Sequence, residues 1–123
     1  GILVSIRESG EDYLETILIL HKNTGYVRSI DIVNKLNYSK PSVSVAMKKL
    51  RENGYIEVDR NNHISLTQAG SEIAERIYER HRILTKLLMH LGVSEETATE
   101  DACKVEHVIS DESFEAIKKH LSE

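Results

Sequence analysis

Apolar positions near the start of the chain recur at helical spacing. They are Tyr13, Leu14, Ile17, Leu18 and Leu20. This period of three to four residues predicts a helix over about 10–23, and Gly25 is the kind of residue that ends a helix in the left-handed conformation. A second, short helix is expected to begin at Ser29, because a serine hydroxyl can accept a hydrogen bond from the first turn.

A third helix is expected after a turn at Asn37-Tyr38. Ser39 is its predicted N-cap, and Pro41 falls in its first turn, where a missing N–H group costs nothing. Asn53-Gly54 is expected to end it. Its predicted apolar stripe is Val43, Val45, Met47 and Leu50.

Beyond this helix the period changes from helical to alternating. Residues 55–59 and 64–67 each alternate apolar with polar side chains, and the link 60–63 contains two asparagines, which tolerate positive φ. These features predict a β-hairpin. The order helix, helix, turn, helix, hairpin is typical of a winged helix-turn-helix, whose third helix enters the major groove of DNA while the hairpin contacts the flanking backbone.

The remainder of the chain predicts three more helices. A long one ends at Gly92, another runs from about 94 to 110, and the last begins at a predicted cap, Asp111. The expected fold class is therefore mainly α. We predict a winged helix-turn-helix domain over residues 1–70 and an α-helical metal-binding and dimerisation domain over residues 71–123.

Charge is distributed unevenly along the chain, whose formal net charge is −4. Residues 1–70 carry nine basic and eight acidic side chains, and residues 71–123 carry seven and twelve. No acidic residue occurs from Lys40 to Arg51, so the third helix is locally basic, as in many small DNA-binding proteins. A solvated helix face would show the same charges, and a winged helix can also serve protein contacts.

Double-stranded DNA is nevertheless the partner we expect, because topology and charge point to it independently. Hydroxyl and lysine side chains suit close approach to phosphates and base edges. The predicted contacts lie on the third helix and at the hairpin tip. They are Ser39, Lys40, Pro41, Ser42, Ser44, Lys48, Lys49, Arg60, Asn61 and Asn62.

Composition argues against several other classes of protein. Apolar residues make up 40% of the chain and charged residues 29%, as in an ordinary globular domain. No stretch approaches the roughly 18 consecutive apolar residues of a membrane span, and residues 1–6 lack the basic leader of a signal peptide. Cys103 is the only cysteine, so it has no internal disulfide partner. A cytoplasmic location without membrane contact is the expectation.

A second candidate site lies on the predicted helix 94–110. Cys103, Glu106 and His107 are three and four residues apart, which would place them on one helical face. Three metal-competent side chains are unusual for a core stripe. A buried cysteine beside an exposed Glu-His pair is the alternative.

Other metal-competent residues precede this group. Asp12 and Glu15 are three apart on the first predicted helix, and His81 lies on the long helix between two arginines. Carboxylates with imidazoles suit Mn(II) or Fe(II), whereas a thiolate favours Fe(II), Co(II) or Zn(II).

Five short motifs occur together along the chain. They are Glu11-Asp12-Tyr13-Leu14-Glu15, Ser39-x-Pro41-Ser42-Val43-Ser44, Leu66-Thr67-x-x-Gly70, Arg80-His81 and Asp101-x-Cys103-x-x-Glu106-His107-x-x-Ser110. Over nearly the whole length, this set resembles the diphtheria toxin repressor family of metal-dependent transcriptional repressors. The resemblance implies a homodimer that binds a palindromic operator and represses metal-uptake genes, with metal between its two parts favouring the DNA-binding geometry.

The resemblance to individual branches of that family is mixed. Asp12, Glu15 and the lack of a C-terminal SH3-like domain resemble the short manganese transport regulators, whereas Cys103 matches the iron-responsive branch. The implied metal ligands are Asp12, Glu15, His81, Cys103, Glu106 and His107. They could hold one octahedral ion, or two ions bridged by Glu15 and Glu106.

The thiolate leads us to expect Fe(II) as the favoured metal over Mn(II). Thr85 and Thr99 stand where the iron branch has ligands of an ancillary site, so that site is expected to be absent. Two other functions stay open: a winged-helix regulator of an organic ligand, and a small metallohydrolase with Glu106 as general base. The first would need an aromatic-lined pocket, yet the chain has five Tyr and one Phe. The second lacks a nucleophile motif or phosphate loop.

Overall fold

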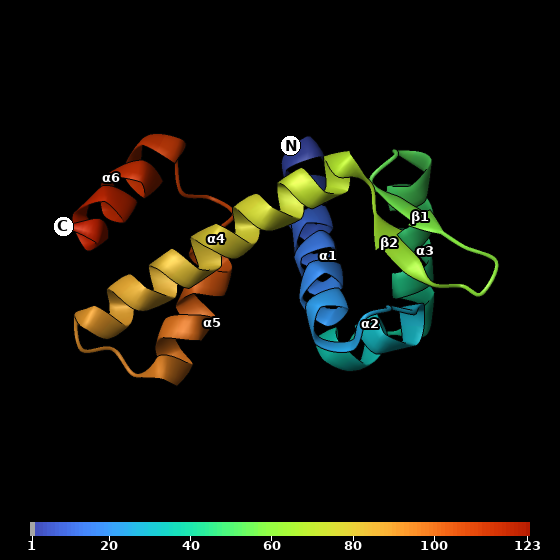
Figure 1. The fold of residues 1–123 in the computed structure, drawn as a ribbon, viewed down its shortest axis with the longest axis horizontal. Helices are drawn as coiled ribbons and strands as arrows, with labels where there is room; N and C mark the ends of the chain where they lie inside the picture. Colours follow the sequence, from blue (N-terminus) through green and yellow to red (C-terminus); the bar gives the residue numbers. More distant parts are fainter. Residues whose placement is uncertain (1) are drawn as a thin grey trace. The chain divides into compact units, whose positions relative to one another are not determined.

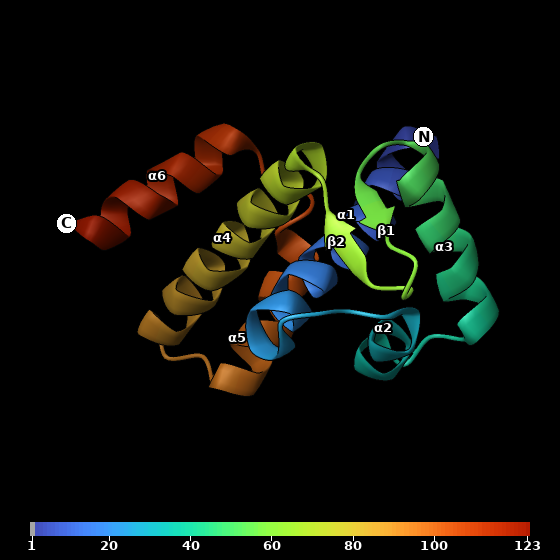
Figure 2. The ribbon, with the colours of Figure 1, turned by 45° about the vertical axis from the view of Figure 1, so that its right-hand side comes forward.

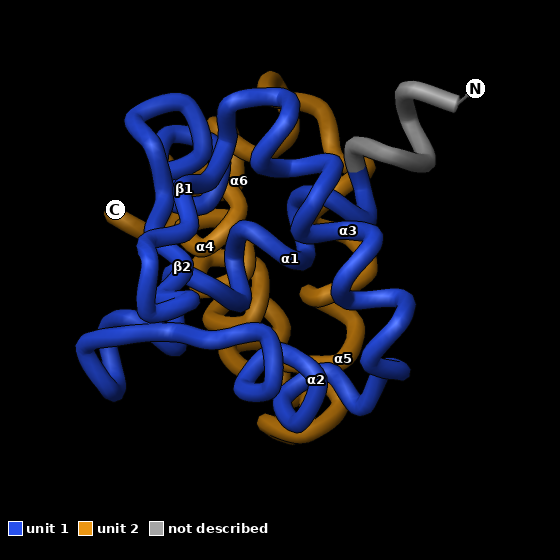
Figure 3. Tube along the Cα trace, turned by 90° about the vertical axis from the view of Figure 1, so that its right-hand side faces the viewer, with its two compact units in different colours: residues 1–75 blue, residues 76–123 orange. Residues whose placement is uncertain are grey.

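The computed structural model describes the backbone of residues 2–123 and the side chains of residues 8–123. Figure 1 shows its elements in chain order, and Figure 3 shows two compact units, residues 1–75 and 76–123. The mainly α fold class is confirmed. The elements are α1 (Ile2–Thr24), α2 (Ser29–Leu36), α3 (Lys40–Glu52), β1 (Ile56–Val58), β2 (Ile64–Leu66), α4 (Gln68–His90), α5 (Glu95–Val105) and α6 (Asp111–Ser122).

The first unit is a winged helix-turn-helix. Helix α1 contacts α2 and β2, and α3 contacts α2 and β1; Figure 2 shows α3 alongside the hairpin. Strands β1 and β2 pair antiparallel, and the loop after α1 joins them through a bridge between Val27 and Ile64. The buried apolar side chains of this unit include Tyr13, Leu14, Ile17, Val27, Ile32, Val43, Met47, Ile56 and Ile64.

Several predicted turns and caps of this unit are confirmed. Ser39 caps α3, because its Oγ accepts from the backbone N–H of Ser42 at 3.2 Å. Asn37 and Asn62 take positive φ of 58° and 63° at the two predicted turns. Gly70 allows a close approach: a Cβ there would lie 2.1 Å from the carbonyl oxygen of Tyr55, so no other residue fits.

Three details of the first unit differ from the prediction. Helix α1 begins at Ile2, well before residue 10. Arg28, not Ser29, occupies the N-cap of α2, where its backbone N–H donates to the Asp31 carboxylate at 2.9 Å. Val45 lies outside the core, 56% exposed, because residues two apart on a helix cannot share the face of Val43 and Met47.

The second unit holds most of α4 together with α5 and α6. Its core contains Ile77, Leu84, Ala98, Ala102 and Phe114. Gly92 ends the α4 region with φ of 101°, as predicted, and the Ser94 Oγ accepts from Thr97 N–H at 3.3 Å to cap α5. A hydrogen bond from Lys118 to Glu79 ties α6 to α4 and raises the pKa of Lys118.

The prediction for the end of α5 is wrong. The helix ends at Val105, not near residue 110, and the amides of Val108 and Ile109 both donate to the Val105 carbonyl at 3.0 Å. Ser110, not Asp111, caps α6, since its Oγ accepts from Ser113 N–H at 3.1 Å. The Ser110 cap marks the start of a separate helix, α6, after the turn over residues 106–109.

Within the described residues, no helix combines the length and apolar character needed to cross a membrane.

Candidate metal centre and DNA-binding surface

The second unit brings three predicted metal ligands together. His81 on α4 approaches Glu106, which follows α5, with its Nδ1 3.0 Å from the carboxylate Oε2. Cys103, one turn earlier on α5, joins them: one donor atom from each of the three residues lies within 4.8 Å of the others. This group, His81, Cys103 and Glu106, is called here the α4–α5 cluster, and it offers nitrogen, sulfur and oxygen donors.

His107 lies beside the cluster in the turn after α5. Its Nε2 is 3.5 Å from Oε1 of Glu106. Because α5 ends at Val105, Glu106 occupies the C-cap and His107 lies outside the helix. The expectation that Cys103, Glu106 and His107 share one helical face is therefore wrong for His107, which reaches Glu106 from the turn.

The burial of Glu106 is compatible with a cation bound in the cluster. Its side chain has no solvent exposure, and within the described structure Oε1 has no hydrogen-bond donor. Removing a carboxylate from water is costly unless its charge is paired and its oxygens are hydrogen-bonded. The imidazoles of His81 and His107 face this carboxylate, and a divalent ion held by Glu106, His81 and Cys103 would add positive charge and a bond to Oε1. The donor types match those of transition metals.

The two remaining predicted ligands lie in the first unit on α1. Glu15 is buried and Asp12 is half-buried. Their spacing of three residues places them on one face of the helix, as predicted.

Seven of the ten predicted DNA contacts lie on α3 or at its N-cap. All of Ser39, Lys40, Pro41, Ser42, Ser44, Lys48 and Lys49 are exposed. Val45 is exposed among them, and sequence reasoning missed it by assigning it to the core. An apolar side chain on an exposed helix face is able to contact the methyl group of thymine.

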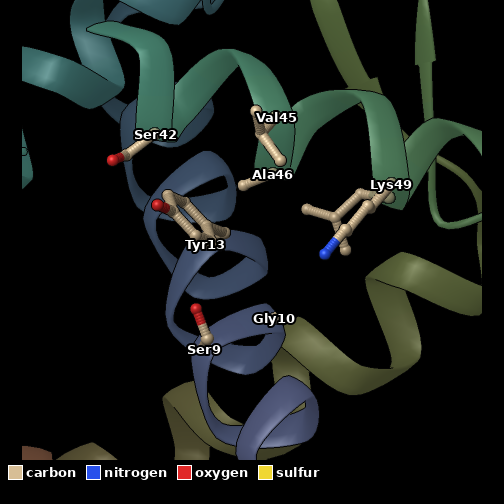
Figure 4. Close-up of a pocket in the computed structure, with 8 residues that line it drawn as sticks. Ser9, Gly10, Tyr13, Ser42, Val45, Ala46 and Lys49 are labelled. Atoms are coloured by element: carbon tan, nitrogen blue, oxygen red, sulfur yellow. The ribbon is translucent and has the colours of Figure 1, made fainter. Parts of the chain in front are cut away.

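A shallow pocket of about 280 Å³ lies between α1 and α3, beside this surface. Figure 4 shows Ser9 and Tyr13 of α1 and Ser42, Val45 and Lys49 of α3 around it. Burial, with Tyr38 and Asp12 nearby, raises the pKa of Tyr13, so its hydroxyl stays protonated. The pocket has one aromatic lining residue, not the aromatic-lined cavity that an organic-ligand regulator would need.

The hairpin tip is ordered by Asp59. Its Oδ1 accepts from the backbone N–H groups of Asn61 and His63 at 2.8 and 2.9 Å. The hydrogen bond from His63, supported by that from Asn61, lowers the pKa of Asp59 despite partial desolvation. The His63 ring stacks on Tyr26 with 5.0 Å between centroids, which anchors the tip to the loop after α1.

Three predicted wing contacts, Arg60, Asn61 and Asn62, are exposed in this tip. Sequence reasoning did not identify Asp59 or Tyr26 as residues that order it. The alternating pattern of residues 55–59 predicted Asp59 only as the polar residue at the end of a strand.

Two family models match nearly the whole chain. One is described as "Iron dependent repressor, N-terminal DNA binding domain" and matches residues 5–64. The other is described as "Iron dependent repressor, metal binding and dimerisation domain" and matches residues 67–123.

Curated relatives agree with these matches. An uncharacterized HTH-type transcriptional regulator of Methanocaldococcus jannaschii is 37% identical over 113 residues, which cover 90% of each chain. The transcriptional regulator MntR of Escherichia coli O6:H1 is 37% identical over 112 residues, which cover 91% of this chain and 72% of that protein.

Solved structures share the fold. The manganese regulator SloR superposes with a TM-score of 0.80 at 31% identity and IdeR of T. acidophilum with 0.83 at 28%, each over 92% of this chain. The matched regions are 53% and 54% of those chains, so this chain spans about half their length. Since both domain models match in order and the curated relatives are transcriptional regulators, not enzymes, the chain belongs to the iron-dependent repressor family, as its five motifs led us to expect.

Proposed function

We propose that this protein is a divalent-metal-dependent transcriptional repressor that binds a palindromic DNA operator as a homodimer and controls metal-uptake genes. The observation that carries the proposal is Glu106, a fully buried carboxylate beside two imidazoles and a thiol, one of whose oxygens accepts no hydrogen bond from any described residue. Such a group is best explained as part of a metal centre. A protein that acts on DNA is proposed to be cytoplasmic.

The two domains divide this work. We assign DNA binding to residues 1–70 and metal binding with dimerisation to residues 71–123. The exposed lysines of α3 supply the charge that phosphate contacts need, while its serines and Val45 face outward to read bases. The exposed hairpin tip, ordered by Asp59, supplies the wing contacts of Arg60, Asn61 and Asn62.

Dimerisation is supported by apolar side chains that the second unit leaves exposed. They are Met89, Leu91, Val105 and Val108. All four lie at or just beyond the C-terminal ends of α4 and α5. A second copy related by a two-fold axis would bury them, and the same axis would match a palindromic operator.

The proposed ligand set is Asp12, Glu15, His81, Cys103, Glu106 and His107. The geometry of the α4–α5 cluster supports the members from the second unit, while Asp12 and Glu15 are assigned from their spacing and family motif. Whether this set binds one ion or two stays open.

Two observations bear on which metal is preferred. The similar solved structures include a manganese regulator and a manganese-dependent transcriptional repressor in complex with manganese, which favours Mn(II). The sulfur of Cys103 within reach of His81 and Glu106 favours Fe(II), because thiolates bind softer ions better. We propose Fe(II) as the preferred activator, with Mn(II) binding more weakly.

Linkage connects the ligands to DNA binding. A divalent ion bound by these residues would supply positive charge that offsets their carboxylates. The proposed ligands come from both units. Abundant metal therefore favours whichever arrangement of the units binds the ion more tightly, and the difference in metal affinity between the arrangements sets the size of this shift.

Metal-dependent DNA binding tests this function. Purified protein, stripped with chelator, is used to select sites from a random double-stranded DNA library with Fe(II), with Mn(II) and with neither. We expect palindromic sites to be enriched only with metal. Equal enrichment without metal would contradict the proposal and favour an organic-ligand regulator.

A further inference from the structure

We propose that Arg80 is a positioning residue of the metal centre. It holds the turn that carries Glu106 and His107 in its ligand-presenting conformation before metal binds. The inference rests on the proposed function, because it assigns a role within that same site.

The contacts of Arg80 converge on this turn. Its side chain is 8% exposed, and Nη1 donates to the carbonyl oxygens of Glu106 at 3.2 Å and Ile109 at 2.8 Å. Nη2 donates to the carboxylate of Asp111, and the guanidinium lies 5.5 Å from the ring centre of Phe114. One side chain thus bonds to both ends of the segment between α5 and α6.

That segment needs such support because it lies outside regular structure. The carbonyl groups at a helix end have no donor within the helix, and a buried carbonyl without a donor is unstable. Arg80 supplies N–H groups to two of them. It therefore stabilises the turn in which Glu106 and His107 follow α5. It does not stabilise the longer helix, to about residue 110, that the apolar period predicts.

Glu106 is held from α4 at two points. Arg80 binds its backbone carbonyl, and the next residue, His81, lies 3.0 Å from its carboxylate. Two attachments to adjacent residues of one helix fix both the position and the direction of the side chain. The planar guanidinium makes three hydrogen bonds at once, whereas a lysine ammonium on a flexible stem does not hold the same geometry.

A purely structural role would be the alternative, since a buried arginine also stabilises the packing of α6. The two roles differ in which property an Arg80 variant loses, metal affinity or fold stability. A positioning role predicts a loss of metal affinity larger than the loss of fold stability. A structural role predicts that affinity in the folded protein is unchanged.

Four variants separate these roles. Arg80→Lys keeps the positive charge but removes the planar guanidinium that bonds several acceptors at once. Arg80→Met removes both the guanidinium and the charge. Asp111→Asn removes the charge of one largely exposed partner and leaves both carbonyl bonds. Arg82→Met is the matched control, an exposed arginine two residues away on the same helix.

Titration measures the affinities for Mn(II) and Co(II), and urea unfolding measures the stability of each variant. Amide hydrogen exchange of the metal-free protein measures how well the turn is ordered. We expect Arg80→Lys to weaken both affinities about 10–100-fold, as loss of a partner that orients ligands does. Exchange over 106–110 should accelerate at least about tenfold in the metal-free variant, with α4 still protected. Arg82→Met should match the wild type, and Asp111→Asn should fall between.

Folded Arg80→Lys with wild-type metal affinity and wild-type exchange over 106–110 would overturn the role of Arg80. If Arg80→Met does not fold, Arg80→Lys and Asp111→Asn still decide it. A wild-type protein that binds neither ion would instead overturn the proposed function, so the two failures are distinct.

Discussion

Nδ1 of His81 lies 3.0 Å from Oε2 of Glu106, although 25 positions separate the two residues in the chain. Packing of α4 against the end of α5 creates this pair within the second unit. The carboxylate is fully buried, and its other oxygen faces Nε2 of His107 at 3.5 Å without a hydrogen bond from any described residue. Cys103 lies one turn away on α5. The three metal-competent side chains of the α4–α5 cluster are therefore brought together inside one unit.

Replacing Glu106 with Gln should separate stability from metal binding. The amide has no charge to desolvate, so the metal-free variant should be as stable as the wild type or up to about 1 kcal/mol more stable. Metal affinity should fall more than the roughly 100-fold upper range for loss of a ligand's outer partner. Urea unfolding and metal titration of the same sample measure both. A metal-free variant destabilised by several kcal/mol would show that the carboxylate is already fully paired.

Lys48 and Lys49 should contribute to DNA binding without regard to sequence. Each Lys→Ala change should weaken binding to operator and random DNA alike and reduce the slope of log affinity against log salt by about 1. Anisotropy titrations at four salt concentrations measure this. Lys119→Ala, an exposed lysine on α6, is the control and should leave the slope unchanged. Unaltered slopes in both α3 variants would remove this helix from the DNA interface.

Acidification should disorder the hairpin tip through Asp59. Its pKa in the folded protein is lower than the ordinary 3.8, so the hydrogen bonds to Asn61 and His63 are fully present above that pH. They are lost as the pH falls through the lowered folded pKa. The amide chemical shifts of Asn61 and His63 should titrate together below pH 3.8, and Asp59→Asn should remove this titration. A midpoint above 3.8 would contradict the assignment.

The dimer should depend on the exposed apolar surface of the second unit. Val108 and Leu91 are each 69% exposed, so Val108→Arg or Leu91→Arg should change the unfolding free energy of the monomer by no more than about 0.5 kcal/mol. Sedimentation at micromolar concentration should show dimers for the wild type and monomers for both variants. Ile30→Arg on α2 should remain dimeric. Dimeric Val108→Arg and Leu91→Arg would place the interface elsewhere.

Much of the fold follows from local sequence signals. Ser39, Asn37 and Asn62 marked a cap and two turns correctly, because each acts through hydrogen bonds or dihedral angles of its own neighbourhood. Val45 was misplaced because alternate residues of a helix were counted in one stripe. Its exposure becomes clear only when α3 packs through Val43 and Met47.

The site was harder to predict than the fold. Three-residue spacing correctly placed Cys103 and Glu106 near each other, whereas His81, on another helix and 25 positions before Glu106, was joined to them only by the family resemblance. The end of α5 was missed because it depends on long-range hydrogen bonds from Arg80, 26 positions before Glu106. Apolar periodicity carries no information about a distant guanidinium that binds carbonyl groups.

Anaerobic titration of the metal-free protein with Co(II) tests the central claim, that the α4–α5 cluster is a metal centre. A thiolate bound to Co(II) gives an intense near-ultraviolet charge-transfer band. We predict that this band appears in the wild type and saturates at a fixed stoichiometry, that affinity rises with pH because Cys103 releases a proton, and that Cys103→Ser abolishes the band. A wild-type titration without the band, with unchanged Co(II) affinity in Cys103→Ser, would remove the thiolate from the site and shift the preferred metal to Mn(II).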